Sequence, residues 1–439
     1  MDCSLPVQKA EGRDLKDEAK PANNDAPMKS DSATQPAARL ITLMCLAEIL
    51  NMVGIFAFPA LLPHFIELWD LSNTQAGWIS GIYFGGYTLS VPILGGLTDR
   101  LDPRRIYLWA SLVGIGAALG FALLAEGFWT ALCFRALAGF GLAGTFIPGL
   151  KALVDRLNEK AQTRAIAFYT ATFSLGTALS FFAAGFLTEH FGWRLAFGCA
   201  AGTGTLALLL AAWGLKPKPP AGVQHTGRHF LDFRPVLRNR QAMGYILAYT
   251  THTWELFAAR SWMVAYLSFA LTLQPQGATP FLSPSSVMAV TALFAMWASV
   301  GGAELAVLFG RHRVLRCIMW GSACIACSLG FLPALPYPLL TGICLIYFLF
   351  VQGDSATLHT AAIQAAQVEQ RGLTMAFQSL IGFGAAFVSP LAVGLILDLS
   401  GGGTHSLSWG AAFASMGLVI ALGPVFIRLF CETDSSRAS

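Results

Sequence analysis

Charged residues are scarce in this sequence. Asp, Glu, Lys and Arg together make up only 12% of its 439 residues, whereas a soluble globular protein carries about 25%. Hydrophobic residues account for 55%, and the mean hydropathy is +0.59. This balance excludes an ordinary water-soluble domain and indicates a chain that folds in a lipid bilayer.

The cysteine pattern lacks the features of a disulfide framework. The nine cysteines fall in apolar runs or on the side of the membrane that we expect to be cytoplasmic, at positions 3, 45, 133, 199, 317, 324, 327, 344 and 431. Disulfides persist in oxidising compartments, so none is expected. Cys324 and Cys327 have the spacing of a redox motif, but they lie inside an apolar run without further metal ligands, and packing is the preferred interpretation.

Enzyme signatures are also missing from the sequence. No Ser/His/Asp set, H-E-x-x-H helix or phosphate-binding loop is present. We therefore predict a protein that is not an enzyme and that uses neither a cofactor nor a metal ion. The net charge of +4 reflects the distribution of Lys and Arg along a membrane chain, so no nucleic-acid partner is predicted.

Long apolar runs are abundant. A helix needs about 20 apolar residues to cross the hydrocarbon core of a bilayer. Twelve such runs occupy residues 40–66, 75–97, 105–125, 128–153, 165–187, 194–215, 242–272, 284–309, 314–333, 338–362, 373–397 and 408–430. They predict an all-α membrane protein with twelve transmembrane helices.

The positions of Lys and Arg predict the orientation, because both residues resist translocation. With the amino terminus in the cytoplasm, 25 of the 28 lie in the tails and inner loops, and the outer loops hold only Arg194. We expect both termini to be cytoplasmic. No signal peptide is visible, because the first apolar run follows a charged segment and is too long for one.

The chain divides into two halves at its longest interior polar stretch. We predict a disordered cytoplasmic tail at 1–38, a six-helix bundle at 39–215, a cytoplasmic linker at 216–240, a second six-helix bundle at 241–430 and a cytoplasmic tail at 431–439. The segment "GGLTDRLDPRRIYL" after the second run is similar to "AELAVLFGRHRVL" after the eighth. Such a duplication is typical of secondary transporters with a site near the midplane.

The loop after the second run resembles a signature of the major facilitator superfamily, G-x-L-x-D-R-x-G-R-[RK]. The matching residues are Gly95, Leu97, Asp99, Arg100 and Arg104. Asp102 and Pro103 depart from the pattern. The fourth run is similar to a second signature, R-x-x-x-G-x-G, at Arg135, Gly139 and Gly141.

This resemblance covers roughly residues 40–430 and is to uncharacterised bacterial members, which implies a bacterial inner-membrane protein. It implies a transporter in which two bundles rock around a central cavity, lined by the first, fourth, seventh and tenth helices. It also implies that Gly95, Asp99, Arg100 and Arg104 form a gating loop that joins the halves. The second copy of the loop has Val307 in place of the acid. The alternative is that the basic residues determine topology only.

Ionisable residues inside the spans are candidates for a substrate and proton pathway, because such groups need a partner, a wet cavity or a function. They lie on the four helices expected to line the cavity: Glu48, Arg135, His252, Glu255, Arg260 and Asp354. Proton coupling through Glu48, Glu255 or Asp354 is one hypothesis. The alternative is that each acid is an ionised partner of Arg135 or Arg260.

Helix geometry separates two of these candidates. Arg260 is displaced by about 140° around the helix from Glu255, so it is expected to reach a substrate or an acid on another helix, with Asp354 favoured. His252 lies one turn before Glu255 and is either a titrating group or a hydrogen-bonded packing residue. Trp254 and Trp262 stack on a substrate or pack between helices.

The two buried arginines favour a small organic anion or an amphipathic metabolite as the substrate, and the three acids favour a cation or a zwitterion. We expect a monomeric secondary transporter that uses protons as a symporter or an antiporter. A facilitative uniporter and a transporter-like receptor or accessory protein remain alternatives.

Overall fold

The structure is a computed structural model that describes residues 37–98, 100–218, 232–275 and 280–432. Most of the predicted tails and linker, and Asp99 of the predicted gating loop, therefore lie outside the described residues.

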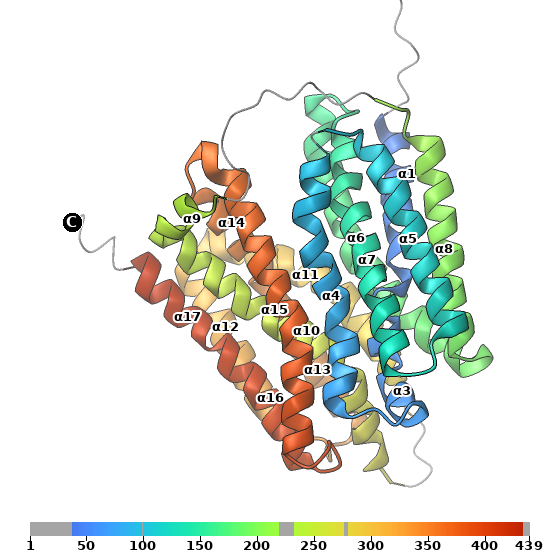
Figure 1. Cartoon of the computed structure of the whole chain (residues 1–439). Helices are drawn as coiled ribbons and strands as arrows, with labels where there is room; N and C mark the ends of the chain where they lie inside the picture. The colour runs from blue at the N-terminus through green and yellow to red at the C-terminus, as the bar shows by residue number, and fades with distance from the viewer. Residues whose placement is uncertain (1–36, 99, 219–231, 276–279, 433–439) are drawn as a thin grey trace, which may run out of the picture. The chain divides into compact units, whose positions relative to one another are not determined.

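The described part of the chain forms helices without strands, arranged as twelve columns (Figure 1). The first six columns are α1 (Ala37–Asn51) with η1 (Met52–Gly54), α2 (Ala57–Ala60) and α3 (Leu62–Leu68), then α4 (Asn73–Leu97), α5 (Pro103–Leu124), α6 (Phe128–Val154), α7 (Glu159–Phe191) and α8 (Trp193–Gly214). After the short α9 (Arg234–Arg238), the others are α10 (Arg240–Thr272), α11 (Pro284–Phe309), α12 (Arg311–Leu329), α13 (Tyr337–Gly353) with α14 (Ser355–Gln364), α15 (Arg371–Leu399) after η2 (Val368–Gln370), and α16 (Ser406–Ile420) with α17 (Leu422–Ile427) and η3 (Arg428–Glu432).

Nine of these columns are long and apolar enough by themselves to cross a membrane, as judged within the described residues. The other three are α4, α10 and α12, with 25, 33 and 19 residues. Helix α10 is less apolar because it contains Glu255 and Arg260, and α12 because it begins with Arg311, Arg313 and Arg316. The predicted fold of twelve transmembrane helices is confirmed.

Several helices begin at a side-chain cap that the sequence supplies. The Ser72 hydroxyl accepts a hydrogen bond from the Gln75 amide, and the Ser72 amide donates one to the Gln75 side chain, which makes a capping box before α4. Asp102 caps α5, and Asn239 caps α10. These caps place the starts of the helices near the predicted ends of the apolar runs.

Two of the four helices expected to line the cavity are interrupted. The first column leaves the α-helical path after Asn51 and resumes at Ala57, although the sequence indicated one continuous run. The tenth is broken at Asp354, between α13 and α14. Broken helices expose backbone groups within a membrane protein, and such groups often line binding sites.

Close helix packing explains the glycines of the fourth column. The backbone of Gly139 lies against the carbonyl of Tyr83 on α4, and Gly141 lies against Gly114 on α5. A Cβ at either glycine would overlap these neighbouring backbone atoms, so small residues are required where the helices meet.

The two halves pack together along two helix pairs, α4 with α15 and α7 with α11. We use the name linker side for the end of the molecule where α8 ends and α10 begins, which is uppermost in Figure 1. We use the name far side for the opposite end, which contains residues 69–72 and 400–405. Gly77 and Gly81 of α4 lie against the backbone of Pro390 and Phe387 of α15.

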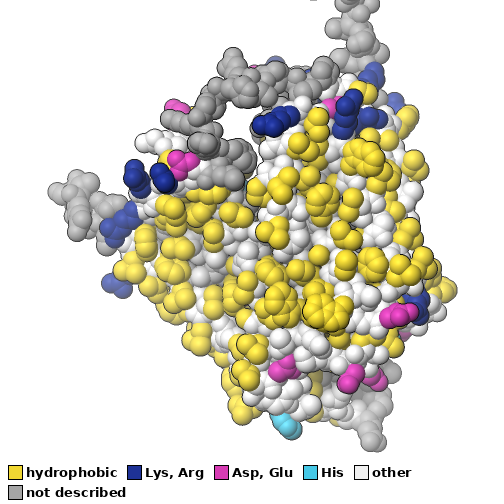
Figure 2. Space-filling model, in the orientation of Figure 1, with side chains coloured by type: hydrophobic (Ala, Val, Ile, Leu, Met, Phe, Trp, Pro, Cys, Tyr) yellow, Lys and Arg dark blue, Asp and Glu magenta, His cyan; other side chains and the backbone are white. Residues whose placement is uncertain are grey.

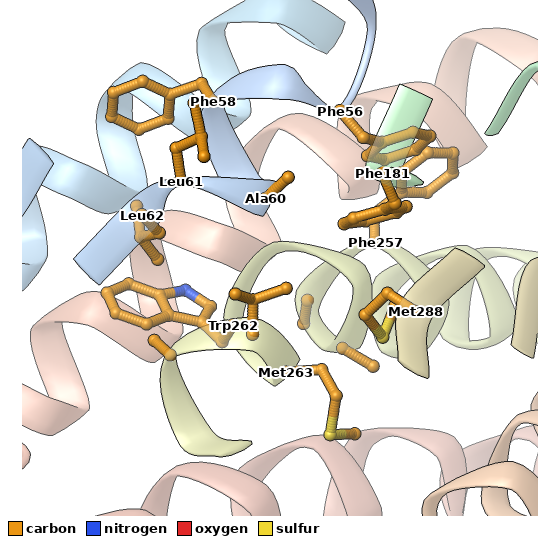
Figure 3. Close-up of a cluster of buried hydrophobic side chains, with 14 of the residues drawn as sticks. Phe56, Phe58, Ala60, Leu61, Leu62, Phe181, Phe257, Trp262, Met263 and Met288 are labelled. Carbon is orange, nitrogen blue, oxygen red and sulfur yellow. The ribbon is translucent and has the colours of Figure 1, made fainter. Parts of the chain in front are cut away.

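A buried aromatic cluster joins the halves near their centre (Figure 3). The ring of Phe56 stacks on Phe181 with 5.1 Å between centroids, and both belong to the first half. Phe84 of the first half lies 4.3 Å from Phe257 of α10, measured between ring centroids. Phe56 and Phe257 of this cluster also lie next to the guanidinium of Arg260.

Candidate functional site

Glu48 is fully buried on α1 and is held by a tyrosine. The Tyr169 hydroxyl, from α7, lies 2.9 Å from its Oε2 atom and donates to it. Beside this contact, the Asn51 amide donates to the Tyr107 hydroxyl over 2.7 Å. The second carboxyl oxygen, Oε1, has no hydrogen-bond partner among the described residues.

Glu255 occupies a similar environment in the second half. It is fully buried on α10, and its Oε1 atom accepts hydrogen bonds from Ser322 of α12, over 2.9 Å, and Tyr347 of α13, over 3.0 Å. Its Oε2 atom has no partner within the part of the chain that the structure describes. Each half thus holds one glutamate by hydroxyl groups of its own helices.

Asp354 pairs with His252. The His252 Nδ1 and Asp354 Oδ1 atoms are 2.7 Å apart, and the side chains are 1% and 2% exposed. The expectation that Asp354 faces Arg260 is wrong, because His252 and Arg260 are eight residues apart, which is about 12 Å along a helix. The break before α14 lies at the level of His252.

Arg135 stabilises the interruption of the first column. Its Nη1 and Nη2 atoms donate to the carbonyl oxygens of Gly54, over 3.2 Å, and Ile55, over 2.9 Å. Its guanidinium also lies 4.4 Å from the centroid of the Tyr83 ring. Within a membrane these carbonyl groups need a donor once the helix is broken. Arg135 therefore has a structural task that accounts for its burial.

Arg260 has a different environment, although it is equally buried, with 2% of its surface exposed. Its guanidinium carbon lies 5.5, 5.8 and 5.9 Å from the ring centroids of Phe56, Phe173 and Phe257. No carboxylate of the described residues forms an ion pair with it, and its Nη1 atom lacks a hydrogen-bond partner there. Because Phe56 and Phe173 belong to the first half, Arg260 lies where the halves meet.

The two tryptophans of α10 also differ. The Trp262 indole N–H donates to the Pro390 carbonyl over 2.9 Å, and its side chain is fully buried. Trp262 therefore packs between helices of the second half. The Trp254 indole nitrogen is buried and has no partner among the described residues.

The predicted gating loop makes its contacts within the first half. Arg104 donates to the Ala212 carbonyl at the end of α8 over 3.0 Å, Arg100 is exposed, and the space around Gly95 is open. Asp99 lies outside the described residues. None of the contacts formed by the described part of this loop reaches the second half.

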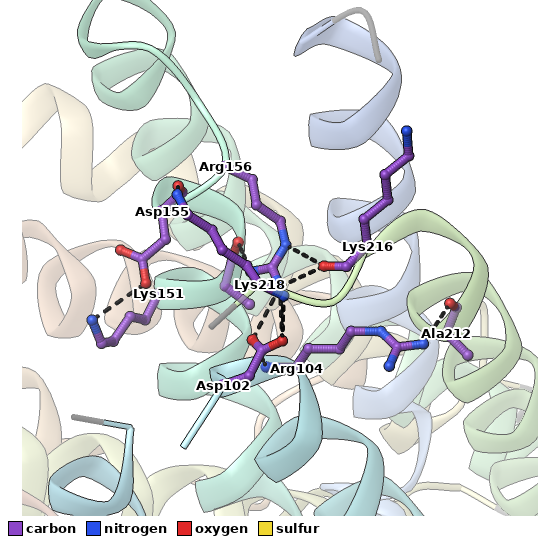
Figure 4. Close-up of polar contacts among 9 residues, drawn as sticks. Asp102, Arg104, Lys151, Asp155, Arg156, Ala212, Lys216 and Lys218 are labelled. Carbon is purple, nitrogen blue, oxygen red and sulfur yellow. Dashed lines mark hydrogen bonds and ion pairs between the residues drawn. The ribbon is translucent and has the colours of Figure 1, made fainter. Parts of the chain in front are cut away.

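Asp102 was missed as a functional acid in the sequence because it departs from the family signature. It accepts hydrogen bonds from the Arg104 amide over 3.0 Å, the Lys218 amide over 2.8 Å and the Arg156 guanidinium over 3.0 Å (Figure 4). Burial by itself raises the pKa of Asp102, but these amide and guanidinium donors outweigh it and hold the pKa below its usual value. Asp102 ties α5 to the residues that follow α6 and α8.

Asp398 was also missed, and it joins the halves on the far side. It accepts hydrogen bonds from the amide and side chain of Asn73, over 3.0 and 2.8 Å, and from the amide and hydroxyl of Thr74, over 2.8 and 2.6 Å. The carboxylate lies at the amino terminus of α4, where a helix favours negative charge. Nothing in the local sequence distinguishes Asp398 from an ordinary acid at the end of a span.

Contacts between the halves extend from the far side to the middle of the molecule. They include Asp398 with Asn73, Gly77 with Pro390 and Phe84 with Phe257. These contacts close the space between the two halves from the far side to about the depth of Arg260.

Twelve membrane-spanning columns in two packed halves, with buried ionisable groups and broken helices near the centre, define a multi-pass membrane transport protein. The chain belongs to the Major Facilitator Superfamily, whose sequence model matches residues 44–379. The resemblance drawn from the two signatures is thereby confirmed.

Protein spinster homolog 1 of Homo sapiens is 24% identical over 332 residues, which cover 70% of this chain and 60% of that protein. The niacin transporter NiaP of Acinetobacter baylyi is 28% identical over 144 residues, which cover 33% and 32% of the two chains. The match spans about half to three fifths of the length of the spinster relatives.

A solved structure shares the fold. The bacterial homologue of the human lysosomal transporter spinster, in an inward-facing and unoccupied conformation, aligns with a TM-score of 0.71 at 15% identity and covers 91% of this chain and 96% of that one.

Proposed function

We propose that this protein is a proton-coupled secondary transporter that moves a small organic anion, or an amphipathic metabolite with an anionic group, by alternating access. The environment of Arg260 is the observation that carries this proposal. Its guanidinium is buried where the halves meet and lacks an acidic partner among the described residues.

An anionic substrate would complete this environment. Aromatic ring faces compensate a buried cation by about 0.5–2 kcal/mol, whereas a carboxylate accepts two parallel hydrogen bonds from a guanidinium. Phe56, Phe173 and Phe257 would pack against the apolar part of the same solute. The similarity to a niacin transporter agrees with this chemistry, because niacin is an aromatic carboxylate.

The acids provide sites for the coupled proton. Glu48 and Glu255 are buried beside hydroxyl donors rather than cations. A buried carboxylate without a cationic partner is costly unless it is neutral, which suits a site that binds and releases a proton. The pair of His252 and Asp354, 2.7 Å apart, lies near Glu255 and would belong to the same path. Opening and closing of the cavity would then load and release protons.

We propose a monomer in a bacterial inner membrane with both termini in the cytoplasm. On the face drawn in Figure 2, hydrophobic side chains cover the middle, and most of the visible Lys and Arg lie toward the linker side. This distribution supports a cytoplasmic linker side. The closed far side would then face outward, and the substrate would enter or leave Arg260 from the cytoplasm.

The decisive experiment is uptake into vesicles that contain the purified protein, with radiolabelled niacin and benzoate as probes and an imposed pH gradient. We expect accumulation by the wild type, its loss in Arg260→Gln, and partial retention in Arg260→Lys. Thermal unfolding of each variant controls for misfolding.

Accumulation by Arg260→Gln at the wild-type level would contradict the role of this residue. Binding of a probe without accumulation would favour a receptor, and transport that is indifferent to the pH gradient would favour a facilitative uniporter.

A further inference from the structure

A second cavity lies on the linker side of the second half, away from Arg260. Its volume is about 730 Å³, and it lies between α10, α11, α12 and α14. The polar residues that matter here are Tyr245, Arg311, His312, Arg313, Arg316 and Thr357.

The lining of this cavity is cationic. Among the described residues, its lining contains three arginines and a histidine but no Asp or Glu. Arg311 donates to the Gln364 side chain, and the Tyr245 hydroxyl lies 2.6 Å from His312 Nε2. These contacts hold two of the basic side chains at the cavity wall. A positive potential in a concave site attracts anions.

The amino terminus of α12 opens onto the same cavity. This helix has 19 residues, and its first residue is Arg311. Its N-cap residue, Gly310, has a φ of +89° and supplies no side-chain cap. The amide groups of the first turn therefore keep their capacity to donate to a ligand, and the helix dipole favours a negative charge at this end.

Thr357 provides an independent indication of a ligand. Its side chain lines the cavity from α14, the residue is only 6% exposed, and its hydroxyl oxygen has no hydrogen-bond partner among the described residues. A buried hydroxyl without a partner is unfavourable by about 1–3 kcal/mol. A bound oxyanion would accept its hydrogen bond.

In the first half, a carboxylate occupies the position that is equivalent to the amino terminus of α12. In the internal repeat, Asp102 corresponds to Gly310, Arg105 to Arg313 and the start of α5 to the start of α12. Asp102 caps α5 and pairs with Arg156. The second half has Gly310 at this position, as the family signature does, so it has basic residues here without this carboxylate.

We propose that the second half binds a phosphate group in this cavity, in the place that Asp102 occupies in the first half. The oxyanion would receive hydrogen bonds from the first turn of α12 and from Thr357, and charge from Arg313 and its neighbours. The phosphate belongs either to the head group of an anionic phospholipid or to a free phosphate solute.

Binding should be measured on the full-length protein with two probes. The first is inorganic phosphate, titrated by calorimetry in detergent at constant ionic strength. The second is phosphatidylglycerol, counted by native mass spectrometry against phosphatidylcholine. We expect the double variant Arg313→Gln with Thr357→Val to lose at least about tenfold in affinity for the probe that binds. Arg105→Gln, at the matching repeat position, is the control and should bind like the wild type.

A selective effect on inorganic phosphate supports the site and identifies a solute as its source, and a selective effect on phosphatidylglycerol supports a lipid source. Failure of both probes to bind the wild type overturns the proposal, as does an equal loss in Arg105→Gln. Arg260→Gln should retain this binding, which keeps the result separate from the test of transport.

Discussion

The two halves of the molecule each bury one arginine and one glutamate, yet they use the arginines differently. Arg135 and Arg260 are both 2% exposed. Arg135 donates to two carbonyl oxygens at the broken first column, whereas Arg260 faces three aromatic rings and has an Nη1 atom without a partner among the described residues. Burial alone therefore does not distinguish an arginine with hydrogen-bond partners from one that lacks an acidic partner among the described residues.

The glutamates are more alike than the arginines. Each has one oxygen that accepts from a tyrosine and a second oxygen without a partner in the described part of the chain. They differ in their surroundings, because Glu255 lies one turn from His252 and its partner Asp354. The second half therefore places a histidine and a second carboxyl group close to its buried glutamate, whereas the hydrogen bond described for Glu48 comes from a tyrosine.

The largest expected effect is a difference in the free energy of unfolding between variants of Arg135 and Arg260. Arg135→Ala removes two charge-assisted hydrogen bonds and leaves the Gly54 and Ile55 carbonyls unpaired, so we expect a loss of about 3 kcal/mol or more in the free energy of unfolding. Arg260→Ala removes a buried charge without an acidic partner and should be neutral or stabilising. Denaturant unfolding in detergent measures the stability of both variants. An equal loss of stability in the two would contradict the different roles of Arg135 and Arg260.

Variants of the two buried glutamates should differ in how strongly a pH gradient drives accumulation. We expect Glu255→Gln and Asp354→Asn to lower pH-driven accumulation by about tenfold or more, because each removes a titratable group from the set of Glu255, His252 and Asp354. Glu48→Gln should cause a smaller loss, because it removes one proposed proton site but leaves the group of Glu255, His252 and Asp354 intact. The measurement is the ratio of uptake with and without a pH gradient in the vesicle assay. A greater loss in Glu48→Gln would assign coupling to the first half.

The contact between the halves should respond to Asp398→Asn. This change removes the negative charge from the amino terminus of α4 and weakens at least one charge-assisted hydrogen bond, so the equilibrium should shift by about tenfold toward an open far side. Electron–electron spin distances between labels at Asp70 and Thr404 report the opening. Labelled Glu126→Gln, which changes an acid elsewhere on the far side, is the control and should keep the wild-type distances.

The smallest effect concerns Asp102, whose counterpart in the second half is Gly310. Its folded-state pKa is depressed, so its contribution to stability is complete above the unfolded pKa of about 4 and is lost as the pH falls through the lower folded value. Asp102→Asn should therefore cost about 1 kcal/mol at pH 7, and the difference from the wild type should shrink below about pH 4. Asp155→Asn, at the exposed pair with Lys151, should change stability less. A difference that grows on acidification would contradict this assignment.

Most of the fold could be predicted from the sequence, but the interruptions could not. Each apolar run became a membrane column, because hydropathy depends only on neighbouring residues. The break after Asn51 could not be predicted, because side chains from distant parts of the chain stabilise it. The Phe56 amide donates to the Ser180 hydroxyl, and Arg135 donates to the Gly54 carbonyl. Both partners lie on other helices.

The candidate site could also be predicted only in part, because the partners of its residues lie on other helices. The list of buried ionisable residues followed from their positions inside apolar runs, and the structure describes all of them as buried. Their partners did not follow: Asp354 was expected near Arg260 and contacts His252. The role of Asp102 was missed because this residue departs from the family signature, and Asp398 escaped notice because acids at helix ends are common.

The sequence by itself determined that this chain crosses a membrane twelve times, that its two halves share a similar segment and that ionisable residues lie deep within its spans, because composition and spacing are local properties. Only the tertiary structure decided which arginine holds a broken helix, which one lacks an acidic partner among the described residues and which acid joins the halves on the far side. Those roles depend on partners distant in the chain, such as Tyr169 for Glu48, 121 residues away, and Asn73 for Asp398, 325 residues away.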